Sequence, residues 1–227
     1  MTFDYRRLLD TVRARFESDA ALEAFLPRPL TSDELKRQGD DRYLSAMTRR
    51  IFHAGVQHAM VDAKWPEFEQ AFQEFDPDAM ALLGPEQIEA HMQNERLIRD
   101  RAKIKSIPEN ARFILDILQE RGTGFGAFLA DWPDTDTIGL WRLLAKRGAR
   151  LGGRSAAGFL RLAGKDTFLL TSDVVARLVA EGVIEREPTS QRDLRAVQEA
   201  FNALRGDSGR PLCQLSALMA LSINPAF

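Results

Sequence analysis

Apolar residues recur every three or four positions along most of the chain, which is the spacing of one face of an α-helix. The clearest stretches are Tyr5, Leu8, Leu9, Val12 and Phe16; Phe68, Phe72 and Phe75; and Ile107, Ala111, Ile114, Leu115 and Leu118. Alternation of apolar and polar residues, which marks a half-buried strand, is nearly absent. The one β-like stretch, residues 166–170 (DTFLL), is too short to seed a sheet and is followed by the good N-cap residues Thr171 and Ser172. The pattern therefore predicts an all-α protein of roughly ten to twelve helices.

Prolines and glycines divide these stretches into separate helices. We expect four prolines in first helical turns, where a missing N–H costs nothing: Pro66, Pro77, Pro85 and Pro108. We expect five glycines to follow helix ends: Gly122, Gly148, Gly164, Gly182 and Gly206. Polar segments at residues 31–42 and 185–192 are typical of connections. They predict a core over residues 46–184, with residues 1–45 and 185–227 packing as a second helical lobe.

Composition is that of an ordinary globular protein, with 227 residues of which 44% are hydrophobic and 28% charged. No apolar run approaches the roughly 18 to 20 residues of a membrane span, and the first residues do not have the pattern of a signal segment. The single Cys213 has no disulfide partner in the chain, so we expect a cytoplasmic protein with no membrane partner. One cysteine and three histidines also disfavour a structural zinc site, and we expect no metal and no cofactor.

Basic residues gather locally although the net charge of −2 gives no overall sign of nucleic-acid binding. Seven basic residues and no acidic one fall between positions 142 and 165: Arg142, Lys146, Arg147, Arg150, Arg154, Arg161 and Lys165. They surround a glycine-rich turn at residues 148–153, between two helical stretches. Glycines there leave backbone N–H groups at a helix N-terminus free to bind an anion such as phosphate. Spacing alone leaves two alternatives open, since an ordinary αα-hairpin with a solvated basic face has the same pattern.

Two long stretches resemble a known group of DNA repair enzymes. Residues 143–173 (LLAKRGARLGGRSAAGFLRLAGKDTFLLTSD) resemble the helix-hairpin-helix of the DNA base-excision glycosylase superfamily, in which an aspartate follows the hairpin. Residues 68–117 resemble the DNA-3-methyladenine glycosylase I family, with FDP, RLIRDRAKIKSI and NAR in matching order and spacing. Together with AGVQHAMVDAKW at residues 54–65, the resemblance covers residues 49–175. It implies a helix-hairpin-helix glycosylase fold, with two helical lobes flanking a DNA-binding cleft.

The resemblance also implies roles for individual residues. Seven hairpin residues would bind DNA phosphates: Lys146, Arg150, Leu151, Gly152, Gly153, Arg154 and Ser155. Asp173 would be catalytic, stabilising the positive charge that builds on the deoxyribose and orienting a water molecule. Asp173 or Ser172 could instead only cap a helix. The lysine nucleophile of the superfamily's lyase branch matches Ser155, so a monofunctional enzyme is expected.

A flipped, damaged base would meet a pocket formed by Phe52, His53, Gln57 and His58, which could stack on it and bond to its edge. The chain departs from the family here. The family's pocket glutamate matches Arg50, its glutamine matches His53 and its stacking tryptophan matches His58. A histidine ligand of the family's zinc matches Asp173, so no zinc is implied. An arginine in the pocket would repel a cationic base, which argues against simple 3-methyladenine specificity.

These observations predict a monofunctional DNA glycosylase of base-excision repair. It would hydrolyse the N-glycosidic bond of an alkylated purine such as 3-methyladenine in double-stranded DNA, and act as a monomer in the cytoplasm, associated with the nucleoid. The missing pocket glutamate favours one alternative, a catalytically inactive helix-hairpin-helix protein that binds damaged or structured DNA. A helical interaction module with no DNA role is the third alternative.

Overall fold

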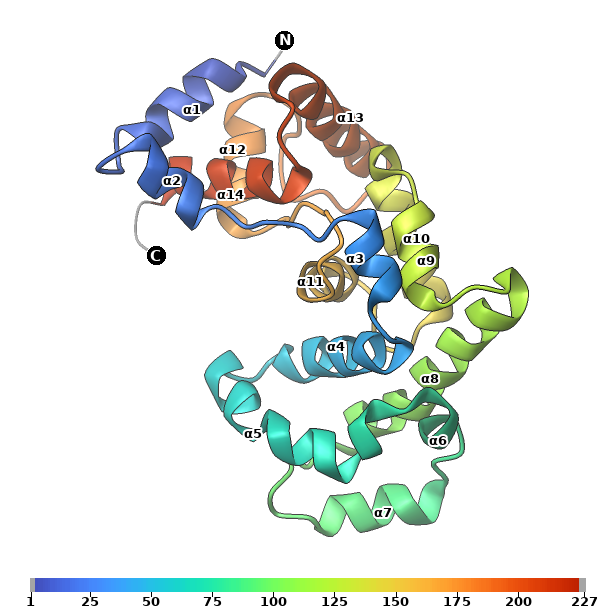
Figure 1. Cartoon of the computed structure of the whole chain (residues 1–227). Coiled ribbons are helices and arrows are strands. Elements are labelled where there is room, and N and C mark those ends of the chain that lie inside the picture. The colour runs from blue at the N-terminus through green and yellow to red at the C-terminus, as the bar shows by residue number, and fades with distance from the viewer. Residues whose placement is uncertain (1–2, 225–227) are drawn as a thin grey trace. The chain divides into compact units, whose positions relative to one another are not determined.

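The computed structural model describes residues 3–224, and every regular element in this range is helical (Figure 1). The prediction of an all-α protein is confirmed. Residues 166–170 form extended chain without a strand partner, and the buried ring of Phe168 stacks on Phe201 at a centroid distance of 4.1 Å. The described residues contain more helices than expected. Short helices such as α6 (Pro77–Ala81) share one continuous apolar pattern with their neighbours but are separated from them by turns. No helix of the described range is both long and apolar enough to cross a bilayer.

The chain divides into two compact units, which are described separately. We call residues 30–132 and 140–165 the hairpin unit, and residues 1–29, 133–139 and 166–227 the terminal unit. These boundaries differ from the expected ones at residues 45 and 184. Residues 30–45 belong to the hairpin unit because α3 (Ser32–Arg37) packs on α9 (Phe125–Asp131). Residues 166–184 belong to the terminal unit because α12 (Ser172–Ala180) packs on α14 (Leu212–Ile223).

The terminal unit is organised around α14, whose apolar residues are almost all buried. Its other elements are α1 (Tyr5–Arg13), α2 (Asp19–Phe25), η2 (Asp134–Asp136), α12 and α13 (Gln191–Ser208). The carboxylate of Asp166 accepts hydrogen bonds from the backbone N–H groups of Leu212 and Cys213, at 2.9 and 2.8 Å. Asp166 therefore caps the first turn of α14 and ties the chain that enters α12 to this helix.

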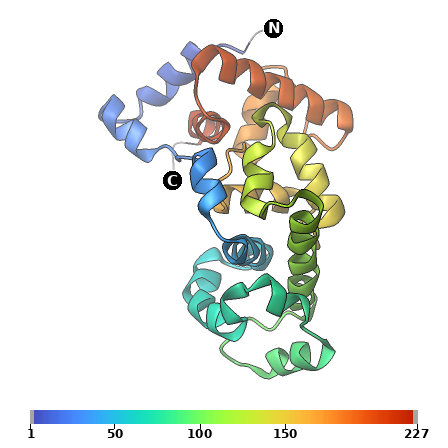
Figure 2. The ribbon, with the colours of Figure 1, turned by 45° about the vertical axis from the view of Figure 1, so that its right-hand side comes forward.

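The hairpin unit is organised around α8 (Arg101–Arg121), which lies against α4 and α6 (Figure 2). Its remaining helices are α4 (Asp40–His53), α5 (His58–Ala71), η1 (Gln73–Phe75), α7 (Pro85–Gln93), α11 (Arg154–Leu162) and most of α10 (Thr137–Arg147). The core is rich in aromatic rings, with Trp65 stacked on both Phe68 and Phe75. One continuous apolar cluster thus links α4, α5 and α8 to α11.

Of the four helix starts expected at prolines, two are right and two are wrong. Pro77 and Pro85 begin α6 and α7, as predicted. Pro66 and Pro108 lie inside α5 and α8, which continue through them. The apolar faces on both sides of each proline are buried together, and this burial offsets the lost backbone hydrogen bond. Gly122 ends α8 at φ 68°, but Gly206 lies within α13, which ends at Gly209 instead.

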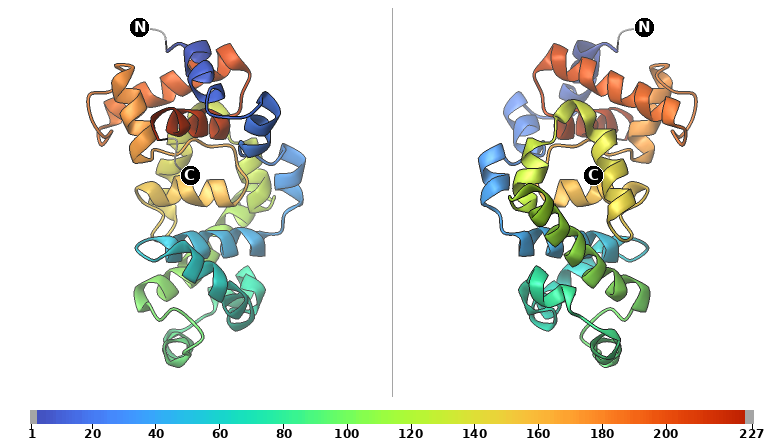
Figure 3. Two further views of the ribbon diagram at one scale, coloured as in Figure 1. Left: turned by 90° about the vertical axis from the view of Figure 1, so that its left-hand side faces the viewer. Right: turned by 90° about the vertical axis from the view of Figure 1, so that its right-hand side faces the viewer.

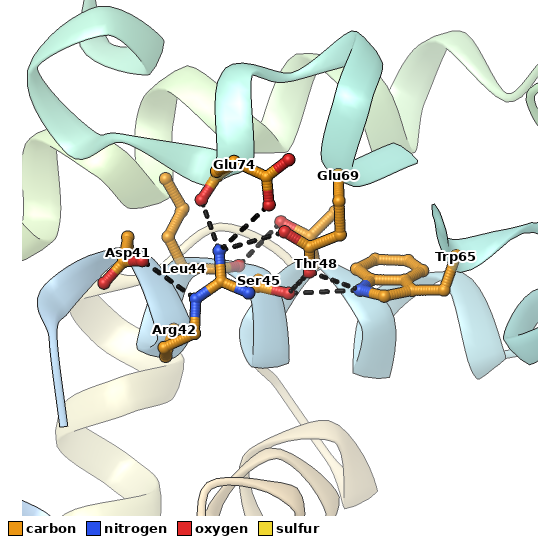
Figure 4. A network of polar contacts seen from close by, with 8 residues as sticks. All are labelled: Asp41, Arg42, Leu44, Ser45, Thr48, Trp65, Glu69 and Glu74. Carbon is orange, nitrogen blue, oxygen red and sulfur yellow. Dashed lines mark hydrogen bonds and ion pairs between the residues drawn. The ribbon is translucent and has the colours of Figure 1, made fainter. Parts of the chain in front are cut away.

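A polar network joins α4 to α5 (Figure 4). The Glu69 carboxylate accepts hydrogen bonds from Ser45 Oγ at 2.6 Å, from Trp65 Nε1 at 2.9 Å and from Arg42 at 3.0 Å. Arg42 also donates to the backbone carbonyl of Glu74 at 2.6 Å. The residues of η1 all have positive φ, between 50 and 60°, and this bond helps to hold them in that uncommon conformation. The network fixes the start of α4, the helix whose other end reaches the candidate site.

Candidate nucleic-acid interface

The expected hairpin is present between α10 and α11. Leu151 is fully buried at the centre of the turn, while Gly152, Gly153 and Arg154 are exposed. A Cβ atom built on Gly152 or Gly153 would meet no atom within 4 Å, so both backbones are open to an approaching ligand. Gly153 has φ 56°, which glycine adopts without strain, and the next residue begins α11. The turn thus exposes the start of a helix, where backbone N–H groups favour anions.

Asn110 holds this turn in place from α8. Its side chain is fully buried and forms two hydrogen bonds to the backbone of Ala149. The Oδ1 atom accepts from the Ala149 N–H at 2.8 Å, and the Nδ2 atom donates to the Ala149 carbonyl at 3.2 Å. Asn110 is the first residue of the NAR motif. The motif contributes to the family resemblance, but the sequence predicts no role for its residues. The signal that could have identified it is a polar residue on the buried face of an apolar helix.

The basic run divides into structural and exposed members. Arg147 forms two bonds of 2.7 Å to the Glu120 carboxylate and lies over the Phe113 ring. Lys165 is 5% exposed and donates to the Trp132 carbonyl at 2.9 Å. Four others, Arg142, Lys146, Arg150 and Arg154, are exposed. The seven-residue excess in the sequence therefore overstates the charge that could face a ligand.

The four proposed base-pocket residues have different surroundings. Phe52 is fully buried and packs edge-on against Phe68 at 4.8 Å, so it offers no exposed face to a base. His53 and His58 stack at 4.1 Å, with His58 exposed and His53 buried. Gln57 is exposed and precedes the first residue of α5. The structure thus brings the two histidines together, while the Phe52 ring packs in the core.

His53 is held by a carboxylate as well as by its stacked neighbour. Its Nε2 atom lies 2.7 Å from the Asp62 carboxylate, which also binds Arg49 at 2.9 Å. Burial lowers the pKa of His53 below its ordinary value, although the hydrogen bond to Asp62 acts in the opposite direction. The same bond lowers the pKa of Asp62. His53 is therefore a neutral, fixed side chain at neutral pH, and His58 has the exposed face of the pair.

A pocket of about 320 Å³ lies beside the hairpin, and none of the four expected base-pocket residues lines it. Its lining residues come from α4, α8 and the hairpin: Ile51, Ala54, Lys103, Arg150, Gly152 and Ser155. Lys103 belongs to the RLIRDRAKIKSI run but carried no predicted role. The sequence could not separate it from the other cations of that run, because only the fold shows which of them is buried.

Arg50, which the resemblance aligns with the family's pocket glutamate, belongs to α4, and its side chain reaches α11, the helix that packs beside α4 (Figure 3). A Cβ atom built on Gly158 would lie 2.1 Å from Arg50 Nε, so the arginine passes directly over this glycine. Its terminal nitrogen contacts the Arg154 carbonyl at 3.5 Å, and its buried Nε has no hydrogen-bond partner among residues 3–224. Burial lowers the pKa of Arg50. Arg50 does not line the pocket beside the hairpin.

Asp173 lies in the terminal unit, in the first turn of α12. Thr171 is the N-cap of this helix, and its side chain accepts from the Val174 N–H at 3.3 Å. The alternative in which Asp173 or Ser172 serves as the cap is therefore wrong. Within residues 3–224 the partly exposed Asp173 carboxylate has no hydrogen-bond or ion-pair partner. In the same range no three cysteine, histidine or carboxylate side chains come together as metal ligands.

Comparison with known proteins agrees with this geometry. The methyladenine glycosylase family profile matches residues 35–143, which include the NAR motif and most of α10. These residues are similar to the methyladenine glycosylase family. The family region thus provides Asn110, Lys103 and the helix that leads into the hairpin.

Individual relatives extend the comparison. A DNA-3-methyladenine glycosylase of Haemophilus influenzae is 37% identical over 76 residues, which are 34% of this chain and 40% of that protein. A 3-methyladenine DNA glycosylase I of Staphylococcus aureus is similar in structure, with TM-score 0.51, 19% identity, and coverage of 69% of this chain and 91% of that one. The Methanocaldococcus jannaschii 8-oxoguanine glycosylase/lyase, solved with DNA, has TM-score 0.53 and 13% identity over 95% and 96% of the two chains. The methyladenine glycosylase family region therefore lies in a chain with the helix-hairpin-helix glycosylase fold.

Proposed function

We propose that this protein is a monofunctional DNA glycosylase of base-excision repair, which hydrolyses the N-glycosidic bond of an alkylated purine such as 3-methyladenine. The observation that carries the proposal is the open hairpin turn held by Asn110, a residue of the methyladenine glycosylase family region. The activities of the relatives support the same chemistry, since one group is named for 3-methyladenine and the other for 8-oxoguanine in DNA.

The proposed partner is double-stranded DNA with a damaged base. Hairpin N–H groups around Gly152 and Gly153, with the exposed Lys146, Arg150 and Arg154, would bind phosphates without reading sequence. One copy of the chain suffices for one lesion, so we propose that it acts as a monomer. A place on the nucleoid in the cytoplasm follows from the substrate.

Asp173 is the proposed catalytic residue. As the base leaves, positive charge develops on the deoxyribose, and a carboxylate beside the sugar lowers the energy of that state. The same group can orient the attacking water. Because its carboxylate is neither a helix cap nor part of an ion pair within the described residues, it is available for this role.

His58 is the proposed stacking residue for the flipped base. It is exposed, and the buried, neutral His53 fixes its ring from behind at 4.1 Å. Two aligned aromatic rings present a larger polarizable face to a base than either ring alone. Gln57, also exposed, could bond to an edge of the base.

The experiment incubates the protein with methylated duplex DNA and identifies released bases by mass spectrometry. The proposal predicts release of 3-methyladenine above the spontaneous rate. A matched reaction with unmethylated DNA gives the background. No release from DNA carrying alkylated, deaminated or oxidised purines, with binding to the same duplexes intact, would overturn the proposal and support the inactive DNA-binding protein. That second candidate is favoured by Arg50, which puts no carboxylate where the family has its pocket glutamate.

A further inference from the structure

Three charged residues follow one another at four-residue spacing along α12, in the terminal unit. Asp173 lies in the first turn of the helix, Arg177 lies in the last turn, and Glu181 is the residue directly after it. Side chains four residues apart share one face of a helix and are within reach of each other. Arg177 therefore has a carboxylate within reach on either side: the proposed catalytic one of Asp173 and that of Glu181.

Arg177 pairs with Glu181 and not with Asp173. Its Nη2 atom lies 2.7 Å from Glu181 Oε1, and the two side chains are only 12% and 20% exposed. Asp173 has no ion-pair or hydrogen-bond partner among residues 3–224. This pairing is the opposite of the intrinsic preference, because an acid four residues before a base gives the better pair in a helix.

Arg177 has hydrogen-bond donors that Glu181 does not satisfy. Its Nε and Nη2 atoms are buried and make no hydrogen bond among the described residues, so the contact with Glu181 is an ion pair without hydrogen-bond alignment. The Phe3 ring lies over the guanidinium, with its centroid 5.6 Å from Cζ. A buried donor without an acceptor costs free energy. Without the charge of Glu181, the guanidinium would therefore be attracted to the other carboxylate on the same face, that of Asp173.

We propose that Glu181 is a positioning residue, which holds Arg177 away from Asp173 and so keeps the Asp173 carboxylate unpaired. An arginine bound to Asp173 would neutralise the negative charge that stabilises the developing positive charge on the deoxyribose. It would also occupy the oxygen atoms that orient the attacking water. The competition of the two carboxylates for Arg177 is independent of base excision, whereas its effect on catalysis rests on the proposed function.

The first test breaks the ion pair from either side and measures single-turnover base release from a duplex that carries 3-methyladenine. We expect Glu181→Gln to slow release about fivefold or more, because a partly buried pair between Arg177 and Asp173 is little screened by water. Arg177→Met should release base at the wild-type rate, and the double variant Glu181→Gln/Arg177→Met should recover that rate. The dissociation constant for the duplex should stay unchanged. Glu185→Gln, which removes an exposed carboxylate from the same unit, is the control.

A purely structural ion pair predicts a different result. Its loss would have the same effect from either side, so Glu181→Gln and Arg177→Met would slow release equally and the double variant would not recover. That result would overturn the proposal, as would release at the wild-type rate by Glu181→Gln. Glutamine keeps the shape of glutamate, and Glu181 follows the end of α12, so the fold should tolerate this substitution.

The second test does not depend on catalysis. A double-mutant cycle in urea measures the effects of Asp173→Asn and Arg177→Met on the free energy of unfolding, singly and together. We expect these effects to be additive in the wild type and non-additive in the Glu181→Gln background, where Arg177 pairs with Asp173. Non-additivity in the wild type, or additivity in both backgrounds, would overturn the proposal. The expected cycle together with no base release by the wild type would support the competition for Arg177 and overturn the proposed function alone.

Discussion

Asn110→Ala tests whether the NAR motif is a structural brace for the hairpin. The substitution removes two hydrogen bonds, of 2.8 and 3.2 Å, to the backbone of Ala149. Each bond of this kind contributes about 0.5–1.5 kcal/mol, so the free energy of unfolding should fall by about 1–3 kcal/mol. For a domain of this size the melting temperature would fall by about 2–12 °C.

Urea unfolding and DNA-binding anisotropy measure the two consequences. We expect Asn110→Ala to lower the urea midpoint and to weaken duplex binding, because the unbraced turn loses its fixed geometry. Asn110→Asp should be at least as damaging, since its second oxygen would face the Ala149 carbonyl instead of donating to it. Asn94→Ala is the matched control, because Asn94 accepts one exposed bond, from the Arg96 N–H at 3.0 Å, in another loop. A wild-type midpoint and wild-type DNA affinity in Asn110→Ala would refute the reasoning.

Three further predictions concern the same unit. Gly148→Ala places a Cβ atom 2.6 Å from Leu151 Cδ1 and 2.9 Å from the Leu144 carbonyl, so it should lower the free energy of urea unfolding by about 1–3 kcal/mol. The control Gly152→Ala has open space around its Cβ atom and should change that free energy by no more than about 0.5 kcal/mol. Equal effects of the two substitutions would contradict the turn geometry. The pKa of His53 in the folded state is lowered from 6.5, so the unfolded state binds more protons and the free energy of unfolding should decrease as pH falls below about 6.5. This decrease should be smaller in His53→Gln, and part of it will persist because burial also lowers the pKa of His91. Identical pH profiles of the two proteins would exclude His53 as a source of the pH dependence. Arg50→Met should leave the melting temperature unchanged or raise it, since it removes a half-buried guanidinium whose buried Nε has no hydrogen-bond partner within residues 3–224. A drop of several degrees would show that the contact with the Arg154 carbonyl is a strong one.

The fold class could be predicted from the sequence because helical periodicity is local. Helix ends were less predictable: Pro108 lies inside α8 because the residues on both sides are buried in one core, which no local rule contains. The boundaries of the two units were not predictable for the same reason, because they depend on contacts between distant segments such as α3 and α9.

Part of the candidate site could also be predicted from the sequence. The glycines marked the hairpin, and Thr171 was recognised as a good cap for the helix that carries Asp173. The prediction of Phe52 as a pocket residue could not be checked from the sequence, because an aromatic residue that faces a ligand and one that packs in the core occur at the same helical spacing. Lys103 was missed because burial of one lysine among several depends on the packing of α8 against α4.

The most direct test of the central claim compares the wild type with Asp173→Asn under single-turnover conditions, with both proteins saturated by a duplex that carries 3-methyladenine. Asparagine keeps the size of the side chain and removes its charge, so the helix and DNA binding should be preserved. The account predicts base release by the wild type and a loss of at least about a hundredfold in Asp173→Asn, with the dissociation constant for DNA unchanged. Equal release rates in the two proteins would contradict the catalytic role of Asp173, and no release by the wild type at saturation would contradict the assignment of this substrate.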